Sequence, residues 1–206
     1  MRIAVLSSDS QWEELVNCSD QVEWVRIPHK KVLSEDPTFA AFFNLAGLIT
    51  DQHDALFSRP VFINAVVETL RSSGAASNLL RINGWPGFLR RNGWEIAGQL
   101  SEEAKQILRV LKKDAIEVPD EPGLIGARII AMIINEAFFA LGEEVSTRKD
   151  IDTALKLGTN YPFGPFEWTG IIGADNILLL LRALALTDKR YLPSPLLIRE
   201  ASRAQL

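Results

Sequence analysis

Short apolar runs separated by polar segments fill the first half of the chain. Runs of this length, rich in β-branched and aromatic residues, are typical of buried strands. The strands expected on this basis are Arg2–Ser8, Val22–Ile27, Leu45–Thr50, Pro60–Val67, Leu79–Asn83, Trp94–Ala97 and Ala115–Val118. A helix is expected over Ser10–Asn17, with Ser10 as its N-cap and Glu13 completing a capping box. The stretch Pro28–Asn44 has no clear period, and we expect it to be irregular or a short helix. Strands alternating with helices indicate a doubly wound α/β domain.

The second half of the chain changes to helical periodicity. Ser101–Lys113 has one apolar face and acidic residues in its first turn, where they favour a helix. Pro122–Leu141 is apolar nearly all round, which is typical of a helix buried in a core or in a subunit interface. Further helices are expected at Thr147–Leu157, Pro165–Ile172, Ala174–Leu186 and Pro195–Ser202. We therefore expect an α/β domain over residues 1–119 and an all-helical domain over residues 120–206.

Composition removes several classes of function. With 22 basic and 26 acidic residues among 206, the net charge of −4 gives no electrostatic footprint for nucleic acid. No run reaches the roughly 18 apolar residues of a membrane helix, and the first residues are too few for a signal-peptide core. The single cysteine, Cys18, excludes an internal disulfide or a cysteine-built zinc site. We expect a cytoplasmic protein with no metal, nucleic-acid or membrane partner.

Five short motifs follow one another in the second half. They are Pro122–Ile129 (PGLIGARI), Asn135–Phe138 (NEAF), Asp150–Ala154 (DIDTA), Pro162–Glu167 (PFGPFE) and Tyr191–Leu197 (YLPSPLL). In order and separation they resemble the C-terminal domain of the 3-hydroxyacyl-CoA dehydrogenases, from about Glu117 to the end. The resemblance implies a helical domain through which that family forms dimers and which closes over the acyl-CoA. A homodimer is therefore expected, with acyl-CoA as the candidate ligand. Pro162 and Phe163 are candidates for lining an acyl pocket, although Pro-Gly-Pro spacing also ends and begins helices.

The first half resembles the Rossmann-like domain of the same family in a shortened form. Residues 60–65 look like the late strand that ends near the active site, which makes Asn64 a candidate substrate contact. Residues 80–86 stand where the family carries its His-x-x-Asn-Pro motif, and Trp85 is a second candidate contact. Residues 94–96 stand where it carries Val-Glu-Val, so Glu95 matches the glutamate that orients the catalytic histidine.

The groups that perform the chemistry in the family are replaced here. Alignment on Glu95 puts Asn83 in the place of the histidine, and alignment on Pro86 puts Ile82 there. Neither side chain can accept a proton near neutral pH. Ala127 stands for the asparagine that helps to position the substrate. Glu95 then remains as a remnant, and a structural ion pair with a nearby arginine is the competing interpretation.

A separate pattern bears on the cofactor. A dinucleotide site needs glycines directly after the first strand, so that the backbone can approach the pyrophosphate at a helix N-terminus. Here the chain continues as Ser7-Ser8-Asp9-Ser10, and Gly47 is its first glycine. We therefore expect no cofactor.

Three hypotheses remain open at this point. The first is a catalytically impaired relative of the 3-hydroxyacyl-CoA dehydrogenases that acts by binding or assembly in acyl-CoA metabolism. The second is an active NAD-dependent enzyme with an atypical site. The third is a non-enzymatic dimeric scaffold that binds a protein partner.

Overall fold

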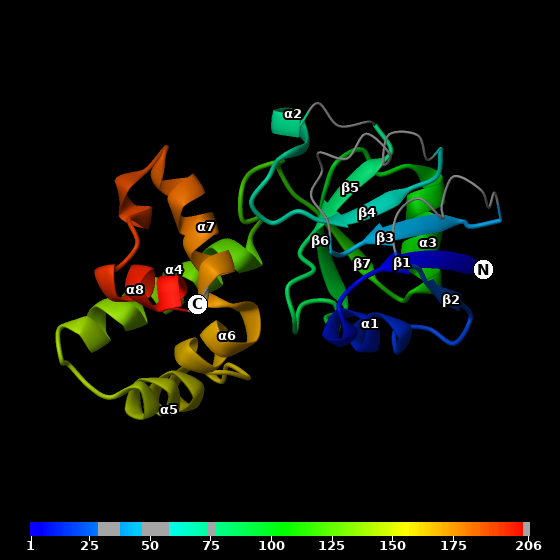
Figure 1. The fold of residues 1–206 in the computed structure, drawn as a ribbon. Helices are drawn as coiled ribbons and strands as arrows, with labels where there is room; N and C mark the ends of the chain where they lie inside the picture. The colour runs from blue at the N-terminus through cyan, green and yellow to red at the C-terminus, as the bar shows by residue number, and fades with distance from the viewer. Residues whose placement is uncertain (29–37, 47–57, 74–76, 204–206) are drawn as a thin grey trace. The chain divides into compact units, whose positions relative to one another are not determined.

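The computed structural model describes residues 1–28, 38–46, 58–73 and 77–203. The chain divides into two compact units, Met1–Leu124 and Ile125–Leu206 (Figure 1). The division falls just beyond Pro119–Pro122, the segment at which the sequence indicates a boundary. The first unit holds the sheet with its flanking helices, and the second is helical.

A seven-stranded sheet forms the first unit. Its strands are β1 (Arg2–Leu6), β2 (Glu23–Arg26), β3 (Ala41–Asn44), β4 (Val61–Asn64), β5 (Leu79–Ile82), β6 (Gly93–Ala97) and β7 (Asp114–Glu117), in the spatial order β2-β1-β3-β4-β5-β6-β7. The five strands from β2 to β5 run parallel, β6 is antiparallel to β5, and β7 is parallel to β6. The strand order reverses between β1 and β3, which makes their carboxyl ends the point where such sheets hold ligands. This confirms the expected shortened Rossmann-like architecture. A dinucleotide-binding sheet has a further strand outside β2, whereas β2 is the edge strand among the residues described here.

Each face of the sheet has its own core. Helices α1 (Asp9–Val16) and α3 (Glu102–Val110) pack on one face, because Leu15 and Ile107 belong to the same buried cluster as Phe43 and Phe62. The rings of these two phenylalanines stack with centroids 4.6 Å apart. Ile27 and Phe39 belong to the core of the opposite face, against which α2 (Leu70–Ser73) places Leu70.

The structure corrects three local predictions. The N-cap of α1 is Ser8 rather than Ser10, because β1 ends at Leu6 and Ser8 forms the capping box with Gln11 instead of Glu13. Residues 41–44, predicted to be irregular or helical, are the strand β3. All four are buried, so this strand lacks the alternation that identifies a half-exposed one. The strand expected at Leu45–Thr50 does not begin at Leu45, which lies in a bend, and residues 47–50 fall outside the described part.

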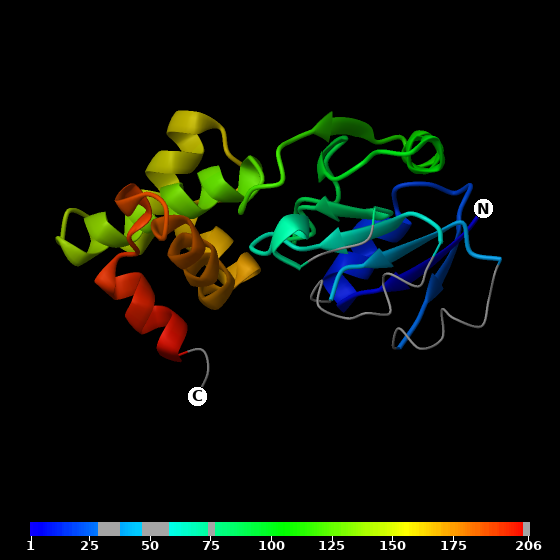
Figure 2. The same ribbon diagram turned by 90° about the horizontal axis from the view of Figure 1, so that it is seen from above.

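The second unit is an arrangement of helices without strands in its described part (Figure 2). Its members are α4 (Gly126–Gly142), α5 (Arg148–Thr159), α6 (Pro165–Ile172), α7 (Ala174–Ala185), the 3-10 helix η3 (Lys189–Tyr191) and α8 (Pro195–Arg203). Helix α4 contacts α6, α7 and α8, and its buried residues include Ala131, Ile134 and Phe138. Asn135, only 2% exposed, donates to Leu192 O and accepts from Ser194 N–H, so it fixes the turn before α8.

Among the described residues, no single helix is long and apolar enough to cross a membrane. Helices α6 and α7 meet that test only as a pair, and they are bent by 99° relative to each other.

Candidate functional site

Amide side chains occupy the carboxyl edge of the sheet. Asn44 and Asn64 are the last residues of β3 and β4, Asn83 directly follows β5, and Gln11 lies in the first turn of α1 after β1. Carboxyl ends of parallel strands meet at one edge, so these four positions come from segments far apart in the chain. The amides carry no net charge, so they can donate and accept hydrogen bonds but do not transfer protons near neutral pH.

Gln11 connects three of these segments. Its side chain donates from Nε2 to Leu45 O at 3.1 Å and to Gly84 O at 2.8 Å, and the residue is only 6% exposed. Its Oε1 accepts from Ser8 N–H at 3.1 Å, which completes the capping box of α1. The side chain therefore lies across the carboxyl edge at the β1–β3 reversal and is fully engaged there with protein groups.

Asn64, predicted to contact substrate, is engaged in the same network. Its Nδ2 donates to Leu45 O at 3.2 Å, and its Oδ1 accepts from Gly84 N–H at 3.0 Å. A Cβ at Gly84 would lie 2.8 Å from Asn64 Cβ, so a larger residue at position 84 has no room. Ligand binding by Asn64 stays a prediction, and a ligand would have to displace these bonds.

Asn83 and Glu95 are brought together. The β5–β6 ladder pairs Arg81 with Ala97 and Ile82 with Ile96, so the same register sets Asn83 opposite Glu95. Both residues line a cavity of about 30 Å³, together with Arg91 and the ring of Trp94. Asn83 Oδ1 accepts from Trp85 N–H at 3.2 Å, whereas the buried Nδ2 has no hydrogen-bond partner in the described part of the chain. Asn83 and Glu95 thus lie at opposed positions and line one cavity, and their role in a catalytic site stays a prediction.

The other predicted contacts are largely packing residues. Trp85 is 5% exposed and makes an edge-to-face contact with Phe88, so little of its surface is available to a ligand. Pro162 and Phe163 belong to the other compact unit, where Pro162 is exposed and Phe163 packs against Trp168. Their role in an acyl pocket stays a prediction.

The segment that follows Phe163 is built to begin α6. Asp152 Oδ1 accepts from Phe166 N–H at 2.8 Å, and Glu167 Oε2 accepts from Gly164 N–H at 2.9 Å. A Cβ at Gly164 would lie 2.3 Å from Asp152 Oδ1, so glycine is required for this close approach. The Pro-Gly-Pro segment therefore has at least the structural role of a helix start.

Charges at the end of β2 are reversed relative to a dinucleotide site. Arg26, the last residue of β2, pairs with Asp9 at 2.7 Å and donates to Ser7 O at 3.0 Å. A site for NAD places an acidic residue at the end of the second strand, for the ribose, and uncharged backbone at the start of the first helix. Here the strand ends in a cation and the helix begins with an anion.

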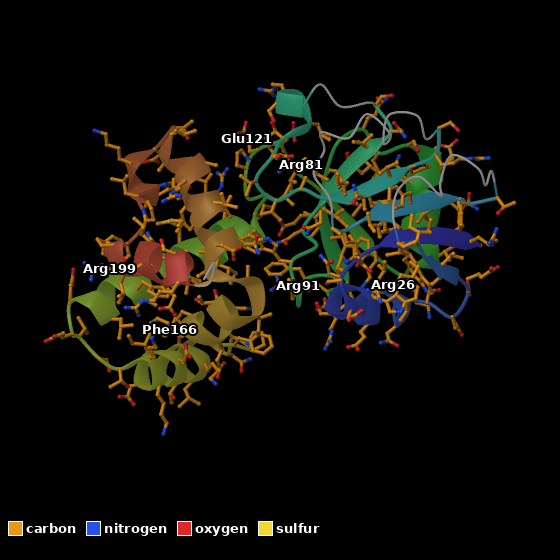
Figure 3. All side chains as sticks on the ribbon, viewed as in Figure 1. Arg26, Arg81, Arg91, Glu121, Phe166 and Arg199 are labelled. Carbon is orange, nitrogen blue, oxygen red and sulfur yellow. The ribbon has the colours of Figure 1, made fainter. Side chains whose placement is uncertain are left out.

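Sequence reasoning missed a buried arginine. Arg81 in β5 has no exposed surface, and its side chain lies beside Glu121 (Figure 3). It donates to Asp120 Oδ1 at 2.5 Å, to Ala65 O at 2.8 Å, and to Val66 O and Glu121 O at 3.3 Å. A charged residue inside the apolar run Leu79–Asn83 was the available signal, because an arginine is rarely buried without a partner.

Asp120 in turn holds two elements together. Its carboxylate also accepts from Leu70 N–H and Arg71 N–H at the start of α2, at 3.1 and 3.0 Å. Burial by itself raises the pKa of Asp120, but hydrogen bonds from Arg71 N–H, Arg81 and Leu70 N–H outweigh it and hold that pKa below its usual range. Arg81 and Asp120 thus fasten the segment that leads out of the first unit to the sheet.

A doubly wound sheet with its ligand edge after β1 and β3 is a Rossmann-like architecture, and here a helical unit follows it. Residues 123–205 match the family model described as the 3-hydroxyacyl-CoA dehydrogenase C-terminal domain. Over 91 residues the chain is 44% identical to 3-hydroxyadipyl-CoA dehydrogenase of Escherichia coli K12, which is 43% of this chain and 19% of that protein. Over 100 residues it is 38% identical to 3-hydroxybutyryl-CoA dehydrogenase of Bradyrhizobium diazoefficiens, which is 48% of this chain and 34% of that protein. The helical unit of this chain therefore matches the C-terminal domain of the 3-hydroxyacyl-CoA dehydrogenases, as the five motifs indicate.

The likeness in fold extends over both units. The crystal structure of FadB2 from M. tuberculosis superposes with a TM-score of 0.75 over 100% of this chain and 94% of that one, at 17% identity. At this identity the comparison shows the fold alone. The chain spans less than half the length of the curated relatives named above. The match over the helical domain therefore does not assign the activity of those relatives to this chain.

Proposed function

We propose that this protein is a 3-hydroxyacyl-CoA dehydrogenase relative that acts by binding or assembly in acyl-CoA metabolism without transferring hydride. The observation that carries the proposal is the buried Gln11, which spans the carboxyl edge of the sheet between Leu45 O and Gly84 O. A nucleotide would use this edge, since it lies where the strand order reverses. We further propose that the protein acts in the cytoplasm.

The described residues at this edge do not fit a dinucleotide. The pyrophosphate needs free backbone N–H groups at the start of α1, with no side chain in the way. Here Ser8 Oγ accepts from Gln11 N–H, and Asp9 adds a negative charge in the first turn. No step of a reaction is therefore assigned to NAD.

The proton-transfer groups support the same proposal. Asn83, opposite Glu95, cannot take the proton of a 3-hydroxyl group near neutral pH. Ile82 and Asn83 are the two positions that can correspond to the histidine of the family, and neither is a histidine. Glu95 therefore has no imidazole to orient at either position. The dehydrogenase reaction requires a bound nucleotide and a proton acceptor. Two independent sets of residues argue against these two requirements here.

A direct assay tests the proposal. With acetoacetyl-CoA and NADH, we expect no loss of NADH absorbance above the rate without protein, and no heat of NAD⁺ binding by calorimetry. An authentic 3-hydroxybutyryl-CoA dehydrogenase serves as the positive control under the same conditions. Turnover at a rate typical of enzymes, about 1 s⁻¹ or more, would establish the alternative of an active enzyme with an atypical site. Heat from acetoacetyl-CoA alone would support an acyl-CoA-binding role.

Exposed apolar residues favour a dimeric assembly through the helical unit. Ile129 in α4 is 51% exposed, and Leu179 in α7 is 55% exposed beside a groove of about 150 Å³ that Ala201 and Ser202 of α8 also line. Contiguous exposed apolar surface is typical of protein interfaces, and we expect these side chains to contribute to one. We propose that the protein forms a homodimer through this unit. A dimer would also be consistent with the hypothesis of a scaffold that binds a protein partner.

The dimer is tested at Leu179. Replacing Leu179 with aspartate should weaken self-association at least about tenfold, since burying an unpaired carboxylate in an apolar interface is unfavourable. Sedimentation velocity at several concentrations measures the effect. Ile116→Asp is the matched control, because Ile116 is similarly exposed (46%) but lies on β7 of the other unit. A wild-type protein that stays monomeric at the highest concentration, or a Leu179 variant that dimerises normally, would refute the assignment.

A further inference from the structure

A small cavity with polar and aromatic walls lies beside the connection from β5 to β6. Its volume of about 30 Å³ exceeds the roughly 10–15 Å³ of such space that one water molecule needs. Phe88 and Trp94 contribute ring surface, while Asn83, Arg91 and Glu95 contribute polar groups. A space of this size with polar walls is the kind that holds an ordered water, whereas apolar cavities stay dry.

The donor on one side of the cavity needs an acceptor. Asn83 is 7% exposed, and its Nδ2 has no hydrogen-bond partner among the described residues. The opposite end of the amide is already fixed, because Oδ1 accepts from Trp85 N–H. Buried polar atoms in folded proteins are nearly always paired, either with protein or with an ordered water. The amide cannot simply turn over, since its NH₂ group would then face the Trp85 N–H donor.

Glu95 provides the second contact from the facing strand. The β5–β6 register sets it opposite Asn83, and its carboxylate can accept several hydrogen bonds at once. Arg91 adds a positive charge to the lining and packs its guanidinium over Phe88, 4.1 Å from the ring centroid. A small cation is therefore disfavoured, and a neutral molecule that both accepts and donates is favoured.

We propose that this cavity binds one water molecule, which accepts a hydrogen bond from Asn83 Nδ2 and donates one to the Glu95 carboxylate. The site is independent of the proposed loss of hydride transfer, because it depends only on the two side chains and the register of their strands. It also implies that a side chain reaching from position 83 toward Glu95 would displace the water and contact the carboxylate directly.

The wild-type protein tests the water itself. A crystal structure at about 1.5 Å resolution should show one ordered water within about 3.2 Å of both Asn83 Nδ2 and a Glu95 carboxylate oxygen. Density for a protein side chain filling the cavity, or a well-ordered cavity with no water, would overturn the proposal. Because this measurement needs no substitution, it stays informative if a variant fails to fold.

A substitution tests the geometry independently. In Asn83→His, the introduced imidazole should contact Glu95, so its pKa measured by NMR should fall by about one unit or more when Glu95→Gln is added. Asn92→His is the matched control, because Asn92 is exposed close by in sequence and its imidazole should respond little to Glu95→Gln. The three charged or titratable groups that face the cavity are then Arg91, Glu95 and the new imidazole. Equal responses at positions 83 and 92 would mean that position 83 does not face Glu95.

Discussion

Replacing Arg81 with methionine is expected to lower the free energy of unfolding by about 3–5 kcal/mol, the usual effect of removing one partner of a buried ion pair. The side chain has no exposed surface, and its removal takes the ion-pair partner from Asp120 and a hydrogen-bond donor from the carbonyls of Ala65, Val66 and Glu121. Methionine keeps most of the volume, so the change reports the lost hydrogen bonds and charge rather than a cavity. Urea unfolding followed by circular dichroism measures the difference.

Two controls distinguish the loss of this ion pair from a nonspecific loss of stability. Arg71→Met changes an exposed arginine in the neighbouring α2 and should alter stability by less than about 0.5 kcal/mol. The pKa of Asp120 lies below its usual range in the folded protein, so its contribution is present above about pH 4 and is lost as the pH falls. The difference in the free energy of unfolding between wild type and Arg81→Met should therefore become smaller in acid. A gap below 1 kcal/mol at pH 7 would mean that the pair does not stabilise the fold.

The helical half of the fold could be predicted closely because its signals are local. Pro165–Ile172 is found with the predicted bounds, and the helix predicted over Thr147–Leu157 is α5, with Thr147 as its N-cap. Capping residues, prolines and glycines act within one or two turns, so their meaning does not depend on the rest of the chain. The family motifs lie on these same elements, so the resemblance to the 3-hydroxyacyl-CoA dehydrogenases is carried mainly by the helical half.

The sheet was harder to predict because its central strands are buried on both faces. Ala41–Asn44 is buried throughout, and the pattern of a half-exposed strand is missing from it. The opposition of Asn83 and Glu95 could be expected only through the motif spacing, since the register of β5 and β6 is a long-range property. The roles of Gln11 and Arg81 in joining the strands could not be predicted, because the partners they bind across the sheet lie 15–73 residues away in the chain.

The replacement of Gln11 by glutamate tests whether the carboxyl edge is closed by this side chain. We expect it to lower the free energy of unfolding by roughly 2 kcal/mol at pH 7, because a buried carboxylate would face Leu45 O and Gly84 O where an NH₂ group now donates. The position in the first turn of α1 favours a negative charge by about 0.3–1 kcal/mol, which offsets only part of this loss. Gln106→Glu on the exposed side of α3 is the matched control and should be nearly neutral.

The pH dependence distinguishes this explanation from a simple packing defect. Burial against two carbonyl oxygens raises the pKa of a carboxyl group above its ordinary value of about 4.3, so the folded variant holds its proton more tightly than the unfolded chain does. The loss of stability is then full at neutral pH and disappears as the pH falls through the ordinary range, where a protonated carboxyl can donate again. The Gln11 variant should therefore approach wild type in acid because its own introduced carboxyl group becomes protonated, whereas Arg81→Met approaches wild type because the wild type itself loses the Asp120 contribution. A loss that is independent of pH would mean that the side chain at position 11 does not face these carbonyls, and the edge of the sheet would then be open to a ligand.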